Sequence, residues 1–301
     1  MKTIKPNSSG VKVNQLTTLT RKEYEIVLKE FDYRVVQKLK RYTLQGHQRK
    51  RIQNRESKNS SLSGSAKKLN FMLMYLKSNM NQSTLGSYFE MSQSKVSQWF
   101  SFLVPVLEYS LDRLGYSPVF GFNYEHEDDS TEYLLGDVTD RDLPRKRCYE
   151  AQKEDFSGKH HKHTEKNFGI CDPRGYIHFL SPSFTGSTHD KPIFDELDIQ
   201  TRGVPFLLDL GFLGAEEDET IILPYKKPKG GQLNPVQKQL NKTISSLRVK
   251  IEHAFAGLKR LKMIKEKIRI PCYMKRQRIV KIAAAIHNLR VSMRNPLLNY
   301  S

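Results

Sequence analysis

Two aspartates occur where acidic side chains could act together on a phosphate. Asp137 lies within or just after residues 133–138, which read as a β-strand, and Asp209 ends a second predicted strand over residues 204–209. In open α/β sheets, ligands bind at the carboxyl ends of the strands. If the two strands are neighbours in the sheet, we expect both carboxylates to face one crevice.

Glu252 would bring a third carboxylate, from a helix. Residues 237–261 have the spacing of an amphipathic helix, with an apolar stripe at Leu240, Ile244, Leu247, Ile251, Phe255 and Leu258. Arg248, Glu252 and Lys259 flank this stripe, within ~40° of one another on a helix that turns by ~100° per residue. The trio suits metal binding beside a phosphate. An Arg and a Glu four residues apart also form ordinary surface pairs, and spacing alone leaves both interpretations open.

Three carboxylates without a partnering cysteine favour a hard, oxygen-preferring cation such as Mg²⁺ or Mn²⁺. Two such ions ~3.5–4 Å apart activate a nucleophile and stabilise the leaving oxygen of a phosphodiester. The three cysteines, Cys148, Cys171 and Cys272, are far apart and form no paired motif. Neither a disulfide framework nor a zinc ribbon is therefore expected.

The positive charge of the chain is concentrated in two blocks. The 301 residues carry a formal net charge of +18. From residue 221 to the end, 19 Lys or Arg stand against only Glu252 and Glu266, and residues 34–68 hold 11 basic side chains against Glu56. These net charges of +17 and +10 leave −9 for the rest of the chain. Two large blocks of one sign predict a polyanionic partner, with nucleic acid as the first candidate.

Other classes are disfavoured by the apolar pattern. No apolar run reaches the ~18 residues that a membrane span needs. The first 15 residues are polar and lack the apolar segment of a signal peptide. We therefore expect a protein that is neither integral to a membrane nor secreted.

Residues 81–100 have the layout of a helix-turn-helix. A short first helix holds Leu85 and Phe89, a turn covers Glu90 and Met91, and Ser92 is expected to cap the second helix. The second helix would bury an apolar stripe made of Val96, Trp99, Phe100 and Leu103. We expect Pro105 to open the next helix.

The polar face of that second helix suits the major groove of DNA. The side chains left outside by the apolar stripe are Gln93, Ser94, Lys95, Ser97 and Gln98. An ordinary helical hairpin without DNA contact is the alternative for this segment.

The order of predicted elements indicates two fold classes in one chain. Residues 23–44 and 69–114 are predicted to be helical, and the polar, basic stretch between them reads as a linker or an arm that orders on a partner. Beyond residue 118, three strands are followed by strands that alternate with helices, which predicts an α/β domain with a mixed sheet. We expect a basic N-terminal region over residues 1–68, a helix-turn-helix domain over 69–116 and the α/β domain over 117–301.

At these motifs the chain resembles the DDE transposases of the PIF/Harbinger-like group, which includes many bacterial insertion-sequence transposases. Residues 137–140, Asp-Val-Thr-Asp, are similar to the family's Asp-Gly-Thr-Glu-like element, and residues 209–212, Asp-Leu-Gly-Phe, match its Asp-x-Gly-Tyr/Phe element. Arg248, Glu252 and Lys259 match its spacing of Arg, three residues, Glu, six residues and Lys.

Further stretches carry the resemblance, and two positions depart from it. Residues 156–164, 186–190 and 287–289 are also similar to family elements. Val138 stands where the family usually has Gly, and Asp140 where it usually has Glu. These departures leave Asp140 as an alternative to Asp137 for the first catalytic aspartate.

The resemblance implies an RNase H-like catalytic domain behind an all-α helix-turn-helix domain. Asp137, Asp209 and Glu252 would be the catalytic residues and the ligands of two Mg²⁺ or Mn²⁺ ions. The implied activity is cleavage at the ends of a mobile element and joining of the 3′ hydroxyls to target DNA. Arg248 and Lys259 would hold the DNA near the scissile phosphate.

The resemblance also implies the partners. Double-stranded DNA would be bound as terminal inverted repeats and as target, by a homodimer or a higher assembly. The helix-turn-helix and the basic arm, with Arg49, Lys50 and Arg51, would recognise the repeats. We expect the protein in the cytoplasm or nucleoid of a bacterium, or in the nucleus of a eukaryote.

Several other residues compete for these roles. Asp190 competes with Asp209 for the second catalytic position and is otherwise expected to cap or support the site. Lys159 and His163 are expected to contact DNA phosphate, because the neighbouring histidines lack the spaced partners of a zinc site. Residues 226–231 read as a flexible DNA-contacting loop, and Cys148, which has no base partner, as inert.

Three rival functions follow from the same features. The chain could be a domesticated, catalytically inactive DNA-binding protein, although all three carboxylates are present. It could be a metal-dependent DNA endonuclease that cuts without joining. An RNA-binding protein is disfavoured by the helix-turn-helix and by the lack of aromatic-rich sheet motifs.

Overall fold

The computed structural model describes residues 16–54, 56, 60–128, 130–216 and 218–295. Contacts divide the chain into two compact units. A helical unit contains the described residues up to Ser117, together with Lys259–Glu266 and Ile270–Met293. A sheet unit contains the described residues of Pro118–Leu258, with Lys267–Arg269 and the described part of Arg294–Ser301. Residues 1–15 of the expected N-terminal region lie outside the described residues.

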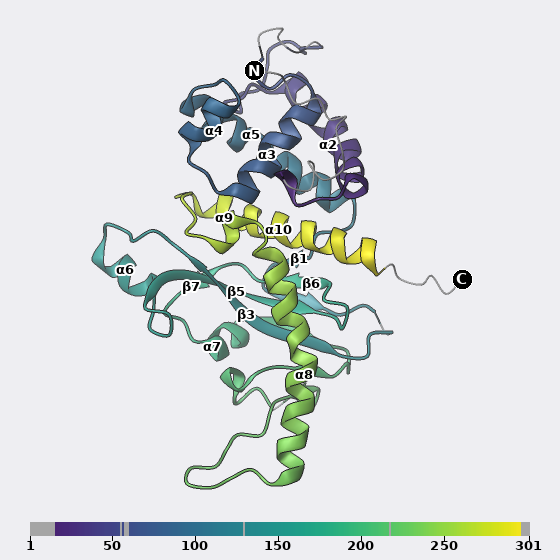
Figure 1. The fold of residues 1–301 in the computed structure, drawn as a ribbon, viewed down its shortest axis with the longest axis vertical. Helices are drawn as coiled ribbons and strands as arrows, with labels where there is room; N and C mark the ends of the chain where they lie inside the picture. The colour runs from purple at the N-terminus through teal and green to yellow at the C-terminus, as the bar shows by residue number, and fades with distance from the viewer. Residues whose placement is uncertain (1–15, 55, 57–59, 129, 217, 296–301) are drawn as a thin grey trace. The chain divides into compact units, whose positions relative to one another are not determined.

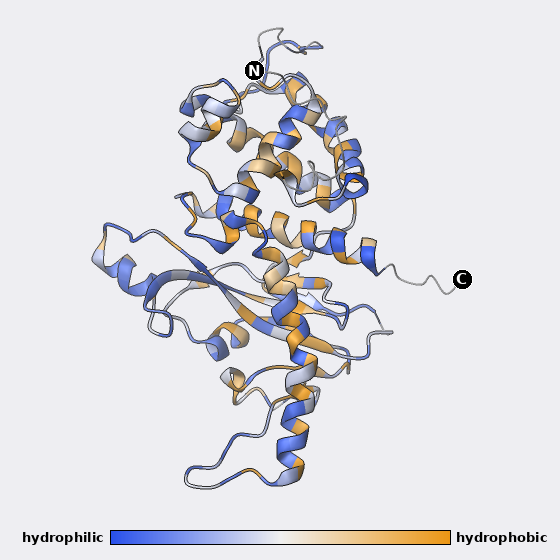
Figure 2. Ribbon diagram, viewed as in Figure 1, coloured by the Kyte–Doolittle hydropathy of each residue, from blue (hydrophilic) through white to orange (hydrophobic). Residues whose placement is uncertain are grey.

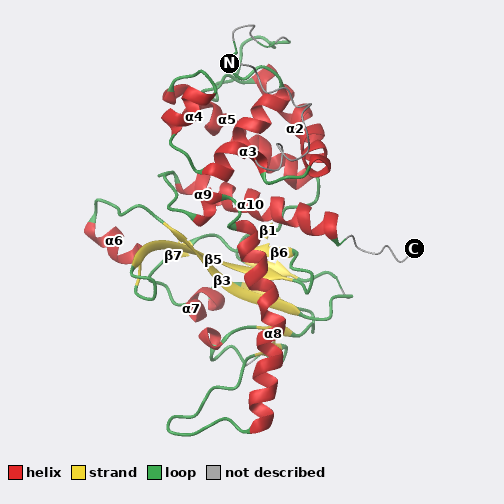
Figure 3. Ribbon diagram, viewed as in Figure 1, coloured by secondary structure: helices red, strands yellow, loops and turns green. Residues whose placement is uncertain are grey.

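The helical unit is built from helices joined by loops (Figure 3). Its helices are α2 (Arg21–Arg41), α3 (Ser65–Ser78), α4 (Gln82–Tyr88), α5 (Gln93–Arg113), α9 (Lys262–Lys265) and α10 (Tyr273–Arg294). Thr20 and Glu23 form a capping box at the start of α2, which satisfies two of the free N–H groups at that helix end. Ion pairs join α10 to α5, from Arg278 to Glu108 at 2.8 Å and from Lys281 to Asp112 at 3.0 Å.

The helix-turn-helix is confirmed in this unit. The Ser92 side chain accepts a hydrogen bond from Lys95 N at the start of α5. The predicted stripe of Val96, Trp99, Phe100 and Leu103 is 0–3% exposed. Glu90 has a φ of 55° in the turn. A Cβ on Gly86 would lie 2.4 Å from Met91 O, so the close approach of α4 to the turn requires glycine there.

Pro105 does not open a new helix. It lies inside α5, which runs without interruption from Gln93 to Arg113. Buried Leu103, Val104, Val106 and Leu107 flank it on both sides. Packing of this apolar face outweighs the one hydrogen bond that proline cannot donate.

The sheet unit contains a mixed sheet, as expected. Its strands include β3 (Leu134–Asp142), β5 (Lys162–Cys171), β6 (Ile177–Leu180), β9 (Phe206–Leu207) and the edge strand β10 (Ile221–Ile222). With β1 (Val119–Phe120), the order is β1-β6-β5-β3-β9-β10. Pairs β3–β5 and β5–β6 are antiparallel, whereas β3–β9, β9–β10 and β1–β6 are parallel.

Shorter elements complete this unit. They are β2 (Asn123–Glu125), α6 (Tyr149–Asp155), β4 (Phe156–Ser157), β7 (Phe184–Thr185), α7 (Asp190–Asp195), β8 (Asp198–Gln200), the 3₁₀ turn η1 (Leu210–Phe212) and α8 (Pro235–Leu258). An apolar cluster that includes Phe168, Phe179, Phe206, Ile193 and Phe212 ties the sheet to α7 and η1. No helix among the described residues is both long and apolar enough to span a membrane.

Helix α8 is anchored by its second half. Figure 1 shows α8 running past β3 and β5, and Ile251, Ala254, Phe255 and Leu258 are buried. The half that begins at Pro235 is mostly hydrophilic (Figure 2), and Leu240, expected in the buried stripe, is 42% exposed. The apolar stripe is therefore used only where the helix lies on the sheet.

Candidate active site

Asp137 is on β3, and Asp209 lies two residues after the end of the neighbouring parallel strand β9. In the register of β3 with β9, Leu135 is paired with Leu207. Continuing this register by two residues would set Asp137 beside Asp209, and the charge of Asp209 acts on Asp137. A Cβ on Gly136 would lie 2.5 Å from the Leu208 side chain, so these two intervening positions share the apolar face. Both aspartates follow on the opposite face, because side chains alternate along a strand.

Helix α8 covers the face that carries Asp137. The register partner of Asp137 on β5 is Gly169, and a Cβ on Gly169 would lie 2.9 Å from the ring of Phe255. Glycine at this position lets α8 approach the sheet closely. About two turns before Phe255, Arg248 Nη2 donates to Asp137 Oδ2 at 3.1 Å. The side chains of Arg248 and Asp137 are 10% and 21% exposed.

The environment of Asp137 opposes its ionisation. Burial raises the pKa of Asp137 to about 6, although the Arg248 guanidinium and the N–H of Val138 act in the opposite direction. The charges of Asp209 and Asp190 add to the rise. The carboxylates of Asp209 and Asp190 therefore interact electrostatically with Asp137, the fourth residue of β3.

Glu252 lies one turn beyond Arg248 on α8, where its side chain is exposed. Residues four apart on a helix are neighbours on its surface, so Glu252 projects from the side of α8 that contacts Asp137. Among the described residues, no three His, Cys, Asp or Glu side chains are close enough together to hold a metal ion. Asp137 and Asp209 are thus brought together, and Glu252 is not gathered with them. Lys259 follows the last residue of α8, outside the helix, and belongs to the helical unit.

The competing aspartates take different positions. Asp140 is on the other face of β3 from Asp137, where it contacts His160 Nε2 at 3.3 Å and Thr164 Oγ1 at 3.4 Å. Asp190 accepts from Lys166 Nζ at 3.2 Å. Lys166 was not singled out from the sequence. Lys166 stands between Glu165 and Asn167, just before the apolar residues that end β5, and no local pattern marks it.

The residues expected to contact phosphate lie around the β4–β5 turn. Lys159 is exposed there, and His163 on β5 is half-buried against the Phe156 ring, with centroids 5.8 Å apart. His163 Nδ1 is buried and has no hydrogen-bond partner among the described residues. Contact of these side chains with DNA stays a prediction.

The residues expected to enter the major groove lie at the start of helix α5. Gln93 and Ser94 are exposed, whereas Lys95 and Gln98 are half-buried. Their placement at the start of the second helix is that of residues that read base edges in a helix-turn-helix. Their contact with DNA stays a prediction.

The basic arm is folded back on α2 as far as it is described. Arg49 Nε donates to the carbonyls of Leu39 and Tyr42, at 3.1 Å each, and Gln53 N donates to Lys40 O at 3.1 Å. Arg49 therefore donates hydrogen bonds to carbonyl groups at the C-terminal end of α2, whereas Lys50 and Arg51 are exposed. The described part of the arm is therefore held by contacts with α2 of the same chain.

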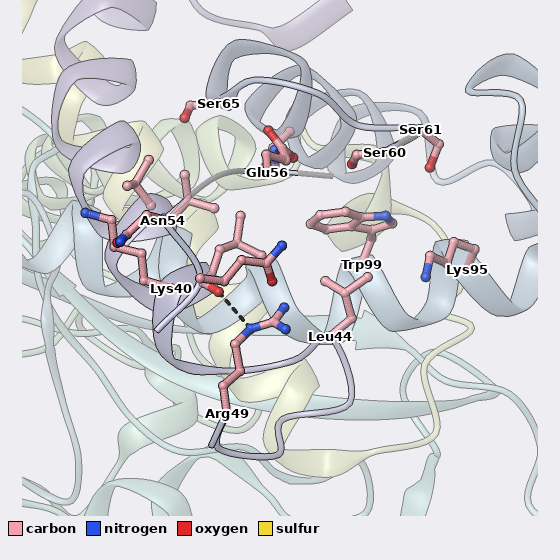
Figure 4. A pocket seen from close by; sticks show the side chains of 15 residues that line it. Lys40, Leu44, Arg49, Asn54, Glu56, Ser60, Ser61, Ser65, Lys95 and Trp99 are labelled. Atoms are coloured by element: carbon pink, nitrogen blue, oxygen red, sulfur yellow. Dashed lines mark hydrogen bonds and ion pairs between the residues drawn. The ribbon is translucent and has the colours of Figure 1, made fainter. Parts of the chain in front are cut away.

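A cavity of about 340 Å³ separates this arm from α5. Figure 4 shows Lys40 and Arg49 facing Trp99 and Lys95 across it. The buried Lys68 side chain donates to Glu56 and to Leu62 O. Lys68 therefore holds the arm against the start of α3.

Comparisons with known proteins agree with both units. Residues 137–288 match the family described as DDE superfamily endonuclease, and residues 61–113 match the helix-turn-helix of DDE superfamily endonuclease. Over 133 residues the chain is 30% identical to a probable transposase for insertion sequence element IS702 from Microchaete diplosiphon. That match covers 42% of this chain and 46% of the relative, so it spans about half the length of the relative. No solved structure gives a significant match.

The first family match begins at Asp137 and includes Asp209, Arg248 and Glu252. It covers β3 from Asp137 onward, the later strands of the sheet unit, the helix α8 and the ion pair described above. The second match covers α3, α4 and α5. The chain therefore belongs to the DDE superfamily of endonucleases, with a helix-turn-helix ahead of a mixed-sheet α/β domain.

Proposed function

We propose that this chain is a DNA transposase that cleaves the ends of a mobile element and joins their 3′ hydroxyls to target DNA. The observation that carries the proposal is the arrangement of Asp137 on β3 and Asp209 just after the parallel strand β9, under the helix that bears Arg248 and Glu252. Family membership implies the use of a divalent metal. The matched relative is called a probable transposase.

The residues present fit a hard divalent cation. Asp137 and Asp209 offer carboxylate oxygens, the donors that Mg²⁺ and Mn²⁺ prefer. The raised pKa of Asp137 reports burial and crowding of negative charge, which a bound cation would offset. We propose Asp137, Asp209 and Glu252 as the residues that would hold two ions. When bound, such ions supply an activated oxygen nucleophile and charge stabilisation at the phosphodiester.

Arg248 has two functions in this proposal. Its Nη2 holds the Asp137 carboxylate on β3. Its other guanidinium N–H groups are proposed to contact a phosphate oxygen of the DNA. Lys259, at the end of the same helix, is proposed to neutralise the backbone further along.

The helical unit is proposed to recognise the terminal inverted repeats. The start of α5 would enter the major groove with Gln93, Ser94, Lys95 and Gln98, and Lys50 and Arg51 would contact the phosphates. Holding two ends at once requires a dimer or a larger assembly on the DNA.

A strand-transfer assay tests the proposal. The full chain is incubated with Mg²⁺, a duplex carrying the ends of its source element and a supercoiled target plasmid. Both cleaved ends and joined products are expected, and both are expected to fall with Glu252→Gln. Cleavage without joined products would favour the endonuclease, which the family description names. Binding without cleavage would favour a catalytically inactive DNA-binding protein.

A further inference from the structure

Lys166 is a buried cation whose counter-ion lies beside the proposed metal site. The residue is 7% exposed, and its Nζ donates to Thr188 O at 2.7 Å and to Asp190 Oδ1 at 3.2 Å. Asp190 is the first residue of α7. Lys166 therefore fixes both the approach to α7 and one oxygen of the Asp190 carboxylate.

The other oxygen of Asp190 lies near Gly211, as does the carboxylate of Asp209. A Cβ on Gly211 would lie 3.4 Å from Asp190 Oδ2 and 2.8 Å from Asp209 Oδ1. The two carboxylates thus flank the same glycine, whose N–H donates to Asp209 Oδ1 at 2.7 Å. Glycine at this position leaves room for both.

This arrangement has an electrostatic cost that an ion pair alone does not require. Lys166 would be neutralised equally well by a carboxylate that faced away from Asp209. Instead, the charges of Asp190 and Asp209 both act on Asp137. Like charges held together in a partly buried site destabilise the metal-free protein unless a cation joins them.

We propose that Asp190 is a supporting carboxylate of the metal site: held by Lys166, it contributes a third negative charge beside Asp137 and Asp209 and raises the affinity for a divalent cation. Mg²⁺ keeps several of its waters in protein sites, so Asp190 need not touch the ion to act. This inference rests on the proposed function, because it assumes that Asp137 and Asp209 hold a metal ion.

The test is Mn²⁺ binding to the full chain without DNA, measured by calorimetry. Outer carboxylates around metal sites typically contribute about 10–100-fold in affinity. Asp190→Asn, which keeps the shape of the side chain, is therefore expected to weaken Mn²⁺ binding at least about tenfold. Asp195→Asn is the matched control, because Asp195 is at the other end of α7 and its side chain is 53% exposed. It is expected to bind Mn²⁺ like the wild type.

Lys166→Met distinguishes an effect of the Asp190 charge from an effect on the position of α7. If Asp190 acts through its charge, removing the lysine leaves that charge in place and Mn²⁺ binding stays equal or becomes tighter. If the pair serves only to hold α7, Lys166→Met and Asp190→Asn weaken binding alike, which overturns the proposal. Unchanged binding by Asp190→Asn overturns it as well.

Asp137→Asn distinguishes this inference from the function on which it rests. Loss of Mn²⁺ binding in Asp137→Asn together with wild-type binding in Asp190→Asn refutes only the role of Asp190. Wild-type binding in Asp137→Asn refutes the metal site itself.

Discussion

Arg248 donates to Asp137 across 111 residues of sequence, at 3.1 Å between Nη2 and Oδ2. This contact joins α8 to β3. It also sets the charge state of the site, because the same guanidinium opposes the rise in the pKa of Asp137 that burial causes. A residue that the sequence suggests as a DNA contact thus has a second partner inside the protein.

Removal of Arg248 should destabilise the sheet unit. Arg248→Ala leaves Asp137 without its cation in a site where its side chain is only 21% exposed. We expect a loss of about 2 kcal/mol at pH 7, below the 3–5 kcal/mol of fully buried pairs because the site is partly open. Urea unfolding measures the change. Lys242→Ala, an exposed position of the same helix, should stay within about 0.5 kcal/mol of wild type.

The contribution of Asp137 to the stability of the metal-free protein should fall as the pH rises from 4 to 7. The pKa of Asp137 is about 6 in the folded state against 3.8 when unperturbed, so the folded state binds more protons in this window. Stability is then present below pH 4 and is lost as the pH passes 6. The shift corresponds to at most about 3 kcal/mol.

Comparison with Asp137→Asn isolates this effect, because asparagine does not titrate. From pH 4 to pH 7, the unfolding free energy of the wild type should fall by up to about 3 kcal/mol relative to that of Asp137→Asn. Addition of Mg²⁺ at pH 7 should restore stability to the wild type only. A difference that stays constant over this range would contradict the assignment.

Gly86→Ala should disrupt the helix-turn-helix. The added Cβ would lie 2.4 Å from Met91 O, so the turn must move away from α4. We expect a loss of about 1–3 kcal/mol, typical of overpacking, as measured by urea unfolding. Ser87→Ala, at the exposed next position, serves as the control and should change stability by no more than about 0.5 kcal/mol.

A variant that loses a base contact and a variant that loses a phosphate contact should differ in the salt dependence of their DNA binding. Gln93→Ala is expected to reduce discrimination between specific and random DNA, by about 1–3 kcal/mol, because amide side chains read base edges. Lys50→Ala is expected to weaken binding to both DNAs alike and to reduce the slope of log K against log salt by about 1. Fluorescence anisotropy titrations at several salt concentrations measure both. Equal loss of discrimination in the two variants would contradict these roles.

The sequence carries the order of elements, and it places Asp209 directly after a short apolar run. Asp137, expected near the end of a strand over residues 133–138, is instead the fourth of the nine residues of β3. The sequence also locates the helix-turn-helix, where the Ser92 cap and the stripe from Val96 to Leu103 are local signals. Family motifs add Arg248 and Glu252.

Tertiary contacts decide what local patterns cannot. Proline is common at the first position of helices. Helix α5 nevertheless continues through Pro105, because apolar neighbours pack on both sides of it. Leu240 is on the predicted stripe but is exposed, because only the second half of α8 meets the sheet. The partner of Lys166 is set by the fold, since Asp190 is 24 residues away. No local spacing in the sequence predicts that pair.

The central claim is that Asp137, on the face of β3 covered by α8, is required for metal-dependent cleavage. The most direct measurement is the rate of Mg²⁺-dependent cleavage of a duplex carrying the element's ends, by wild type, Asp137→Asn and Asp140→Asn. Asp137→Asn should lose roughly a hundredfold or more, whereas Asp140→Asn, on the opposite face of the same strand, should retain cleavage near the wild-type rate. Wild-type cleavage by Asp137→Asn, or an equal loss in both variants, would contradict the account.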